Sequence, residues 1–297
     1  MNTSVLRSVP ARATDAPIGV FDSGVGGLSV WRELAIALPG EDLIYVADQA
    51  HVPYGVRPPD EIARFAHGLT RYLVDAGCKA IVVACNTASA AALKSLREAH
   101  PGLDIIGMEP AVKPAAASTR RGVIGVLATP ATFAGRLFQE TARRHAQGVR
   151  IVAEACEGLA ARIEHGHLDD PDTLAALRAH LAPILAAEAD VLVLACTHYP
   201  FLREAIAAIV GPGCTVIDPA AAIARHLRHR LQAHALLNPC TGPGQRRFVT
   251  TGDPVAFAAA LTRLVGVTAW PGQAHWQQDT IVDHAVTRIG GDANCVA

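Results

Sequence analysis

The sequence predicts an α/β protein of two similar domains, each with a mainly parallel sheet flanked by helices, and an active site in the cleft between them. Short runs of apolar, mostly β-branched residues alternate with longer amphipathic stretches, a pattern typical of parallel strands joined by helices. Two of these runs end in an Ala-Cys dipeptide, at Cys85 and Cys196. Two other runs, 18–21 and 123–128, resemble each other and are separated by nearly the same length of chain. The repeat places one thiol per half at the carboxyl end of a strand, where open α/β sheets bind ligands.

The elements of the first half follow from apolar periodicity and from helix-ending glycines and prolines. A loose extension, 1–16, comes first. Strands are then predicted at 18–21, 42–47, 81–84 and 105–108, and helices at 28–38, 59–77 and 88–100.

The second half is expected to begin with a helix at 111–119. Strands at 122–128, 149–153, 190–195 and 214–217 then alternate with helices at 132–146, 157–166, 171–189 and 200–210. A helix at 219–235, a strand at 247–250 and a helix at 254–264 complete the core. We therefore predict a first domain over 17–110 plus 215–267, a second over 111–214, and a C-terminal tail over 268–297.

The composition excludes several classes of protein. The 297 residues are 51% hydrophobic and 18% charged, with a net charge of −1, which indicates an ordered globular chain of about two domains. No basic stripe suggests nucleic acid as a partner. No apolar run approaches the roughly 18 residues of a membrane span, and no signal peptide is recognisable, so we expect no membrane association. Seven scattered cysteines without a CxxC pair favour a reducing cytoplasm.

Cys85 and Cys196 have the strongest chemical setting in the chain. Each follows a strand and precedes a predicted helix, whose N-terminal amides favour a thiolate. Hydrogen-bonding residues follow both thiols: Asn86 and Thr87, and Thr197 and His198. Buried cysteines are usually small apolar side chains, and we interpret the others in that way: Cys78, Cys156, Cys214, Cys240 and Cys295. Two thiols facing one cleft would suit a reaction on both faces of one carbon.

A glycine-rich turn at 24–27 follows Asp22 and Ser23. Its glycines do not fit a dinucleotide fingerprint, and no phosphate-loop lysine follows. A helix N-terminus with bare amides also binds a carboxylate, although Asp22 could simply cap the helix. The histidines lack metal-ligand spacing, and no lysine lies in a strand-end motif. We therefore expect neither a metal nor another cofactor.

Four motifs together resemble bacterial glutamate racemases, of the aspartate/glutamate racemase family. They are residues 19–28 (GVFDSGVGGL), 52–55 (VPYG), 84–89 (ACNTAS) and 196–200 (CTHYP), within a resemblance that runs from about 17 to 265. The resemblance implies a cofactor-independent racemase that supplies D-glutamate for peptidoglycan. It implies L- and D-glutamate as the molecules bound, with a homodimer left open, and a second domain inserted into the first.

The resemblance also implies roles for individual residues. Cys85 and Cys196 would be the acid–base thiols, assisted by Asp22, His198 and Glu164. Substrate-binding roles are implied for Asp22, Ser23, Pro53, Tyr54, Gly55, Asn86, Thr87, Thr129, Thr132, Thr197 and His198. The chain departs from the common family pattern at 156–159 (CEGL, where CPLF is commoner) and at 48–51 (DQAH, where DTAR is frequent).

Other activities remain open at the level of sequence. A two-thiol racemase for aspartate or a related amino acid is the nearest alternative, although residues 22–27 and 196–200 favour glutamate. A cysteine-dependent amidohydrolase would leave the second matched thiol unexplained. An amino-acid-binding regulatory protein would need neither thiol.

Overall fold

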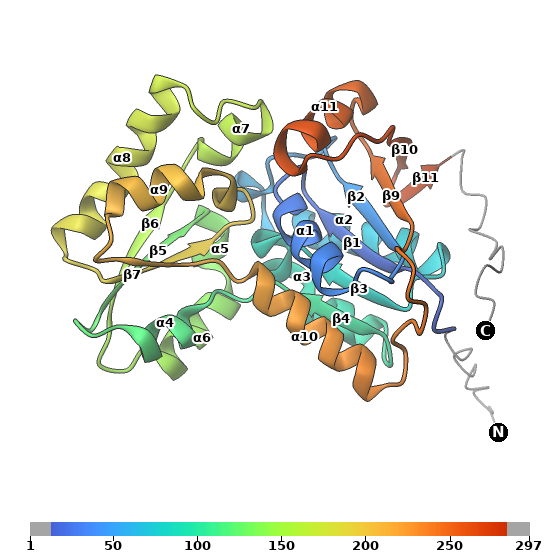
Figure 1. Ribbon diagram of the computed structural model, residues 1–297, viewed down its shortest axis with the longest axis horizontal. Coiled ribbons are helices and arrows are strands. Elements are labelled where there is room, and N and C mark those ends of the chain that lie inside the picture. The colour runs from blue at the N-terminus through green and yellow to red at the C-terminus, as the bar shows by residue number, and fades with distance from the viewer. Residues whose placement is uncertain (1–12, 284–297) are drawn as a thin grey trace.

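The computed structural model describes residues 13–283 and arranges them as two halves side by side, each a sheet between helices (Figure 1). The strands of the first half are β1 (Ile18–Asp22), β2 (Leu43–Ala47), β3 (Ala80–Val83), β4 (Asp104–Gly107), β9 (Arg246–Thr250), β10 (Gly272–Gln277) and β11 (Thr280–Asp283). Those of the second half are β5 (Val123–Ala128), β6 (Arg150–Ala155), β7 (Val191–Ala195) and β8 (Thr215–Ile217). All of them pair in parallel except β11, which forms an antiparallel hairpin with β10.

Helices cover both faces of each sheet, as buried parallel sheets require. On the first sheet, one face packs against α1 (Leu28–Ala37), α10 (Ala220–Ala233) and α11 (Pro254–Val265), and the other against α2 (Pro59–Asp75) and α3 (Asn86–Ala99). On the second sheet, α7 (Leu159–Glu164), α8 (Pro171–Ala186) and α9 (Arg203–Val210) cover one face. Helices α4 (Val112–Ser118) and α6 (Arg136–His145) cover the other. The remaining short helices are α5 (Pro130–Ala134), η1 (Tyr54–Val56) and η2 (Tyr199–Leu202).

The two halves share one strand order, which confirms the predicted α/β fold of two similar units. The first sheet contains the order β2-β1-β3-β4, and the second runs β6-β5-β7-β8. Strand β1 therefore corresponds to β5, and β3 to β7. The second sheet is inserted in the chain between β4 and α10. In each half the chain leaves the first strand toward one neighbour, β2 or β6, and then crosses to the other, β3 or β7. This reversal creates a switch point at the strand ends, where ligands of such sheets bind.

The tail predicted over 268–297 is wrong for its first part. Residues 272–283 form the β10–β11 hairpin, which extends the first sheet beyond β9 through parallel pairing of Gly272 with Val249. The sequence of β10, GQAHWQ, contains no apolar run, because successive side chains of a strand point to opposite faces and only one face of β10 is covered by α2. Ala274 and Trp276 pack toward α2, while their neighbours are exposed. Residues 1–12 and 284–297, the rest of the predicted extensions, lie outside the described residues.

Two other expectations need correction. The predicted domain boundary at 214/215 assigns β8 to the first half, but β8 pairs with β7 in the second sheet. The single helix predicted at 132–146 is divided at Gly135, whose backbone is extended. A Cβ on Gly135 would lie 2.7 Å from the Cβ of Ala90, so the chain bends where the second half closely approaches α3.

Candidate active site

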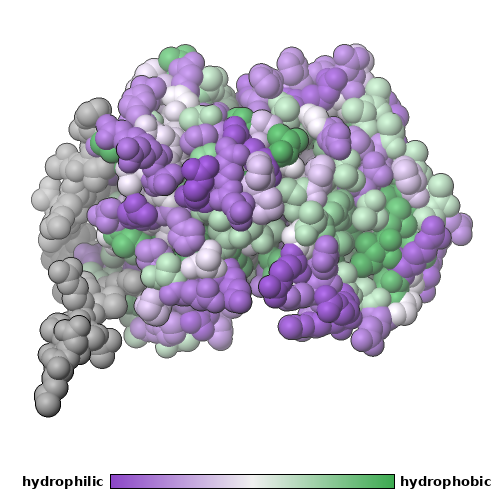
Figure 2. Space-filling view, turned by 180° about the vertical axis from the view of Figure 1, so that it is seen from behind, coloured by the Kyte–Doolittle hydropathy of each residue, from purple (hydrophilic) through white to green (hydrophobic). Residues whose placement is uncertain are grey.

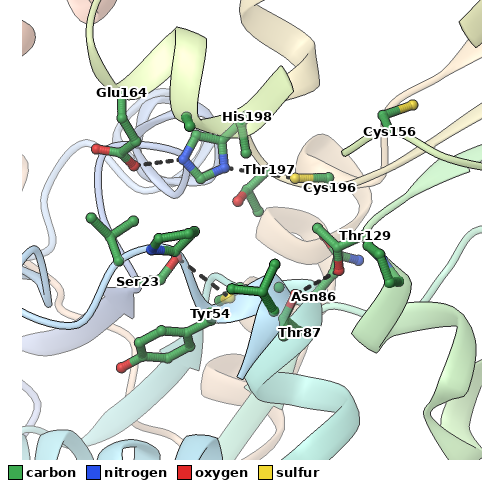
Figure 3. A pocket seen from close by; sticks show the side chains of 18 of the residues that line it. Ser23, Tyr54, Asn86, Thr87, Thr129, Cys156, Glu164, Cys196, Thr197 and His198 are labelled. Carbon is green, nitrogen blue, oxygen red and sulfur yellow. Dashed lines mark hydrogen bonds and ion pairs between the residues drawn. The ribbon is translucent and has the colours of Figure 1, made fainter. Parts of the chain in front are cut away.

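A pocket of about 200 Å³ lies between the halves, where the carboxyl ends of β1 and β3 face those of β5 and β7. Most residues predicted for the site line it: Ser23, Pro53, Tyr54, Gly55, Cys85, Asn86, Thr87, Thr129, Glu164, Cys196, Thr197 and His198 (Figure 3). Asp22 and Thr132 are buried behind this lining. The volume is smaller than the roughly 300–1,000 Å³ of drug-sized ligand sites, so the pocket suits a small metabolite.

Cys85 sits at the junction of β3 and α3, as the sequence predicts. It is the N-cap residue of α3, and its Sγ accepts a hydrogen bond from the Ala88 amide at 3.4 Å. Burial raises the pKa of the Cys85 thiol well above its ordinary value, and the neighbouring Asp22 carboxylate raises it further. The helix amide acts in the opposite direction. The raised pKa favours the protonated form of the Cys85 thiol.

Asp22 lies behind Cys85, at the end of β1. Its Oδ2 accepts hydrogen bonds from the amides of Gly24 at 3.3 Å and Gly27 at 2.8 Å. Its Oδ1 has no hydrogen-bond partner among residues 13–283. Burial raises the pKa of the Asp22 carboxyl, while the positive charge of His198 opposes the rise. The residue thus caps the turn with one oxygen and leaves the other available to a neighbouring group beside Cys85.

Cys196 has a different environment, built from side chains. Its Sγ lies 3.6 Å from Nδ1 of His198, whose Nε2 lies 2.6 Å from Oε1 of Glu164 (Figure 3). Burial by itself lowers the pKa of the His198 imidazole. The hydrogen bonds to Cys196 and Glu164 outweigh that effect, and the pKa is raised well above its ordinary value. The arrangement is a hydrogen-bonded relay from Glu164 through His198 to Cys196, comparable to a cysteine–histidine pair oriented by a third group.

The helix predicted at 200–210 is present, but its α-helical part does not begin directly after Cys196. The turn through His198 leads instead into the 3₁₀ helix η2, and α9 begins only at Arg203. Tyr199 donates its amide hydrogen to the carbonyl of Cys196 at 3.2 Å, so the local backbone forms a turn around the thiol. A helix-terminal amide therefore hydrogen-bonds the sulfur of Cys85, whereas the His198 side chain is the hydrogen-bonding group beside the sulfur of Cys196.

The glycines of the turn at 24–27 allow this relay to approach the first half. A Cβ on Gly24 would lie 2.0 Å from Oε1 of Glu164, and one on Gly26 would lie 2.4 Å from Nδ1 of His198. Val25 donates its amide hydrogen to Oε1 of Glu164 at 2.8 Å. The sequence left open whether this turn binds a ligand carboxylate or is capped by Asp22. The amides of Gly24, Val25 and Gly27 bind the protein's own carboxylates, those of Asp22 and Glu164.

Polar groups suited to a ligand lie on the opposite wall. Asn86 is 3% exposed, and neither atom of its side-chain amide has a hydrogen-bond partner within the described chain. The hydroxyls of Thr87, Thr129 and Thr132 form a cluster that joins the two halves, with separations of 3.0–3.4 Å. Thr132 contacts the other two hydroxyls without lining the pocket. Amide and hydroxyl groups of this kind can donate to a carboxylate.

One wall was missed by sequence reasoning. Cys156, Glu157, Gly158, Ala160 and Ala161 line the pocket near Cys196, although the sequence assigned Cys156 no site role. Burial raises the pKa of the Cys156 thiol to about 12, and Cys196 adds to this rise. One feature of the sequence could have indicated a site role for Cys156, because it directly follows the end of a strand, β6, in the same half as Cys196.

Other features of the molecule are less suited to a small-molecule reaction. A more open groove of about 670 Å³ between the halves is lined by charges of both signs, including Arg97, Glu109, Glu140 and Arg144. Seen from behind, a notch along the lower edge separates the halves and has hydrophilic side chains on both sides (Figure 2).

None of the helices described is long and apolar enough to cross a membrane. Within residues 13–283, no group of three or more His, Cys, Asp or Glu side chains could hold a metal ion.

Comparisons with known proteins agree with this geometry. The family model for Asp/Glu/hydantoin racemases matches residues 18–227. A glutamate racemase of Roseiflexus is 49% identical over 249 residues, covering 84% of this chain and 92% of the relative. A solved glutamate racemase isoform of Bacillus anthracis aligns with a TM-score of 0.82 and 32% identity, covering 90% of this chain and 99% of that one. The glutamate racemase of Francisella tularensis, solved with D-glutamate, aligns with a TM-score of 0.78 and 29% identity, covering 87% and 96%. The chain therefore belongs to the Asp/Glu/hydantoin racemase family and is a racemase.

Proposed function

We propose that the chain interconverts L- and D-glutamate by proton transfer between two thiols, without a cofactor. The observation that carries the proposal is the pair Cys85 and Cys196, which end corresponding strands of the two halves and line one small pocket. The thiols are close enough for a charge on Cys196 to raise the pKa of Cys85. This effect is smaller than those of burial, of the Asp22 carboxylate and of the Ala88 amide. Racemisation needs a base on one face of the α-carbon and an acid on the other, and two such groups are present.

The reaction balances without an external acid or base. One thiolate takes the α-proton, an S–H bond forms, and the electron pair of the broken C–H bond remains on the α-carbon and its carboxylate. The opposite thiol then gives its proton to the other face of the α-carbon and becomes a thiolate. Asp22 and His198 would exchange protons with Cys85 and Cys196 respectively and restore the starting state.

The pocket walls support a dicarboxylate amino acid as substrate. The side-chain amide of Asn86 and the hydroxyls of Thr87 and Thr129 would donate to the α-carboxylate as it gains enolate charge. Ser23, Pro53, Tyr54, Gly55, Thr132 and Thr197 would complete the binding site, directly or through their neighbours. The solved relative from Francisella tularensis holds D-glutamate, which supports glutamate over aspartate. The product D-glutamate would supply peptidoglycan synthesis.

Circular dichroism of L-glutamate incubated with the purified, reduced protein tests this function directly. The signal should decay to zero, because the two enantiomers have equal free energy. Parallel incubations with D-glutamate and with L-aspartate distinguish glutamate racemisation from the aspartate alternative. A stable L-glutamate signal at high concentration of folded protein would overturn the proposal. Decay with L-aspartate alone would assign the other substrate.

A further inference from the structure

A buried carboxylate that the proton transfers do not use lies behind the pocket wall. Asp48 is fully buried just after β2. Four side chains direct hydrogen-bonding groups at it: Tyr54 hydroxyl at 2.6 Å, Trp276 Nε1 at 2.7 Å, Thr251 hydroxyl at 2.8 Å and His51 Nδ1 at 2.9 Å. Two carboxylate oxygens offer about four acceptor sites, so the cluster uses their full capacity. Such a saturated polar network holds its members in one arrangement.

The network has one end at the pocket and another at the first sheet, which carries Cys85. Tyr54 lines the pocket, and its hydroxyl points away from the thiols toward Asp48 (Figure 3). The adjoining Gly55 approaches Thr129 of the second half, so that an added Cβ would lie 3.1 Å from that residue. The amide of Asp48 also donates to the carbonyl of Asp22 at 2.9 Å. Asp48 therefore fixes the Tyr54 wall relative to β1.

The C-terminal hairpin supplies one of the four donors. Trp276 of β10 lies over α2, where a Cβ on Gly68 would come within 2.6 Å of its ring. This contact explains a glycine inside a helix, where alanine would otherwise be better by roughly 1 kcal/mol. The ring also contacts Phe65 at 5.6 Å and His51 at 5.0 Å between centroids. The indole is thus held in place to donate to Asp48.

We propose that Asp48 is a positioning residue for the Tyr54 wall of the substrate pocket. Trp276 extends this support to the β10–β11 hairpin, which makes the hairpin part of the substrate-binding apparatus. The inference rests on the proposed glutamate racemisation. It assigns a function to a segment that the sequence predicts to be a tail.

Trp276→Phe is the central test, because it removes the indole donor and keeps an aromatic side chain on β10. It also removes the ring carbons nearest Gly68, a loss that the double-mutant cycle below separates from that of the donor. We expect KM for both glutamate enantiomers to rise roughly 5-fold, the size expected for one hydrogen bond, while kcat changes less than about 2-fold. Tyr72→Phe is the matched control. The Tyr72 hydroxyl ties α2 to Asp283 of the same hairpin at 3.1 Å without touching Asp48, so its KM should remain within about 2-fold.

A double-mutant cycle identifies the route of the effect. In a Tyr54→Phe background the link from Asp48 to the wall is absent, so Trp276→Phe should add less than about 2-fold to KM. Asp48→Asn provides a second variant and should raise KM more than Trp276→Phe. Equal KM increases for Trp276→Phe and Tyr72→Phe would overturn the proposal, as would full additivity with Tyr54→Phe or an effect on kcat alone. Absence of racemisation in the wild-type protein would instead overturn the proposed function.

Discussion

Cys85 and Cys196 occupy equivalent positions in two similar sheets, yet the groups beside their thiols differ. Cys85 has a helix amide and a buried carboxylate, Asp22, beside it. Cys196 has the relay of His198 and Glu164. The comparison shows that the repeat preserves the position of the cysteine in each half but not its electrostatic environment. The two directions of the reaction should therefore respond to different substitutions.

The largest effect should come from removing either thiol. Cys85→Ser and Cys196→Ser should each lower the racemisation rate by roughly 10²–10⁴-fold, the contribution of a positioned acid–base group. A glutamate analogue with a leaving group on the β-carbon needs only one deprotonation, so each variant should still eliminate it from one enantiomer. Circular dichroism and product analysis measure the two reactions. A variant that racemises at the wild-type rate would show that its cysteine is not an acid–base group.

A substitution in the turn at 24–27 should slow only the reaction of the enantiomer that Cys196 deprotonates. Gly26→Ala places a methyl group 2.4 Å from Nδ1 of His198, and such overpacking costs about 1–3 kcal/mol. We expect a roughly 10-fold or greater loss of rate for the enantiomer that Cys196 deprotonates, as identified with the cysteine variants. Gly213→Ala is the control, since nothing lies within 4 Å of the Cβ it would add. Equal losses for both enantiomers would mean that the turn shapes the whole cleft.

The charge of the relay predicts a pH-dependent stability. Hydrogen bonds to Cys196 and Glu164 outweigh burial and raise the folded-state pKa of His198. A raised histidine pKa stabilises the fold fully below the unfolded value of about 6.5, and this contribution is lost as pH rises through the folded pKa. Glu164→Gln should therefore cost about 1–3 kcal/mol near pH 6 and progressively less in alkaline solution. Urea unfolding at several pH values measures this cost, and a cost that grows with pH would contradict the assignment.

The smallest expected effect concerns the threonine cluster that both halves share. Thr132→Val removes hydrogen bonds to Thr87 and Thr129 behind the pocket, so we expect a loss of about 0.5–1.5 kcal/mol in unfolding free energy. KM should rise less than in Thr129→Val, because Thr129 lines the pocket and Thr132 does not. Thr262→Val on the exposed face of α11 controls for the loss of a hydroxyl. If Thr132→Val raises KM more, Thr132 contacts the substrate directly.

The sequence predicted the strands, the helices and both thiols because these depend on local periodicity and on the repeated Ala-Cys motif. It missed the β10–β11 hairpin, because the strand β10 is polar and has only weak local periodicity. It assigned no site role to Cys156, since an isolated strand-end cysteine does not differ from a core residue in sequence. It left open whether turn 24–27 binds a ligand carboxylate or is capped by Asp22, and only the structure shows that Asp22 and Glu164 occupy three of its amides.

By itself, the sequence determined the fold class, the position of one cysteine per half and the resemblance to a racemase family. The resemblance also implied Asp22, His198 and Glu164 as assisting groups, but only the tertiary structure decided how each of them lies beside its thiol. His198 is two residues from Cys196, but its charge depends also on Glu164, which is 34 residues away and held by Val25 of the other half. Asp48 likewise accepts a hydrogen bond from Trp276, which lies on a strand near the far end of the described chain. Such contacts bring together segments distant in sequence, and their energies depend on burial, which local residue patterns do not specify.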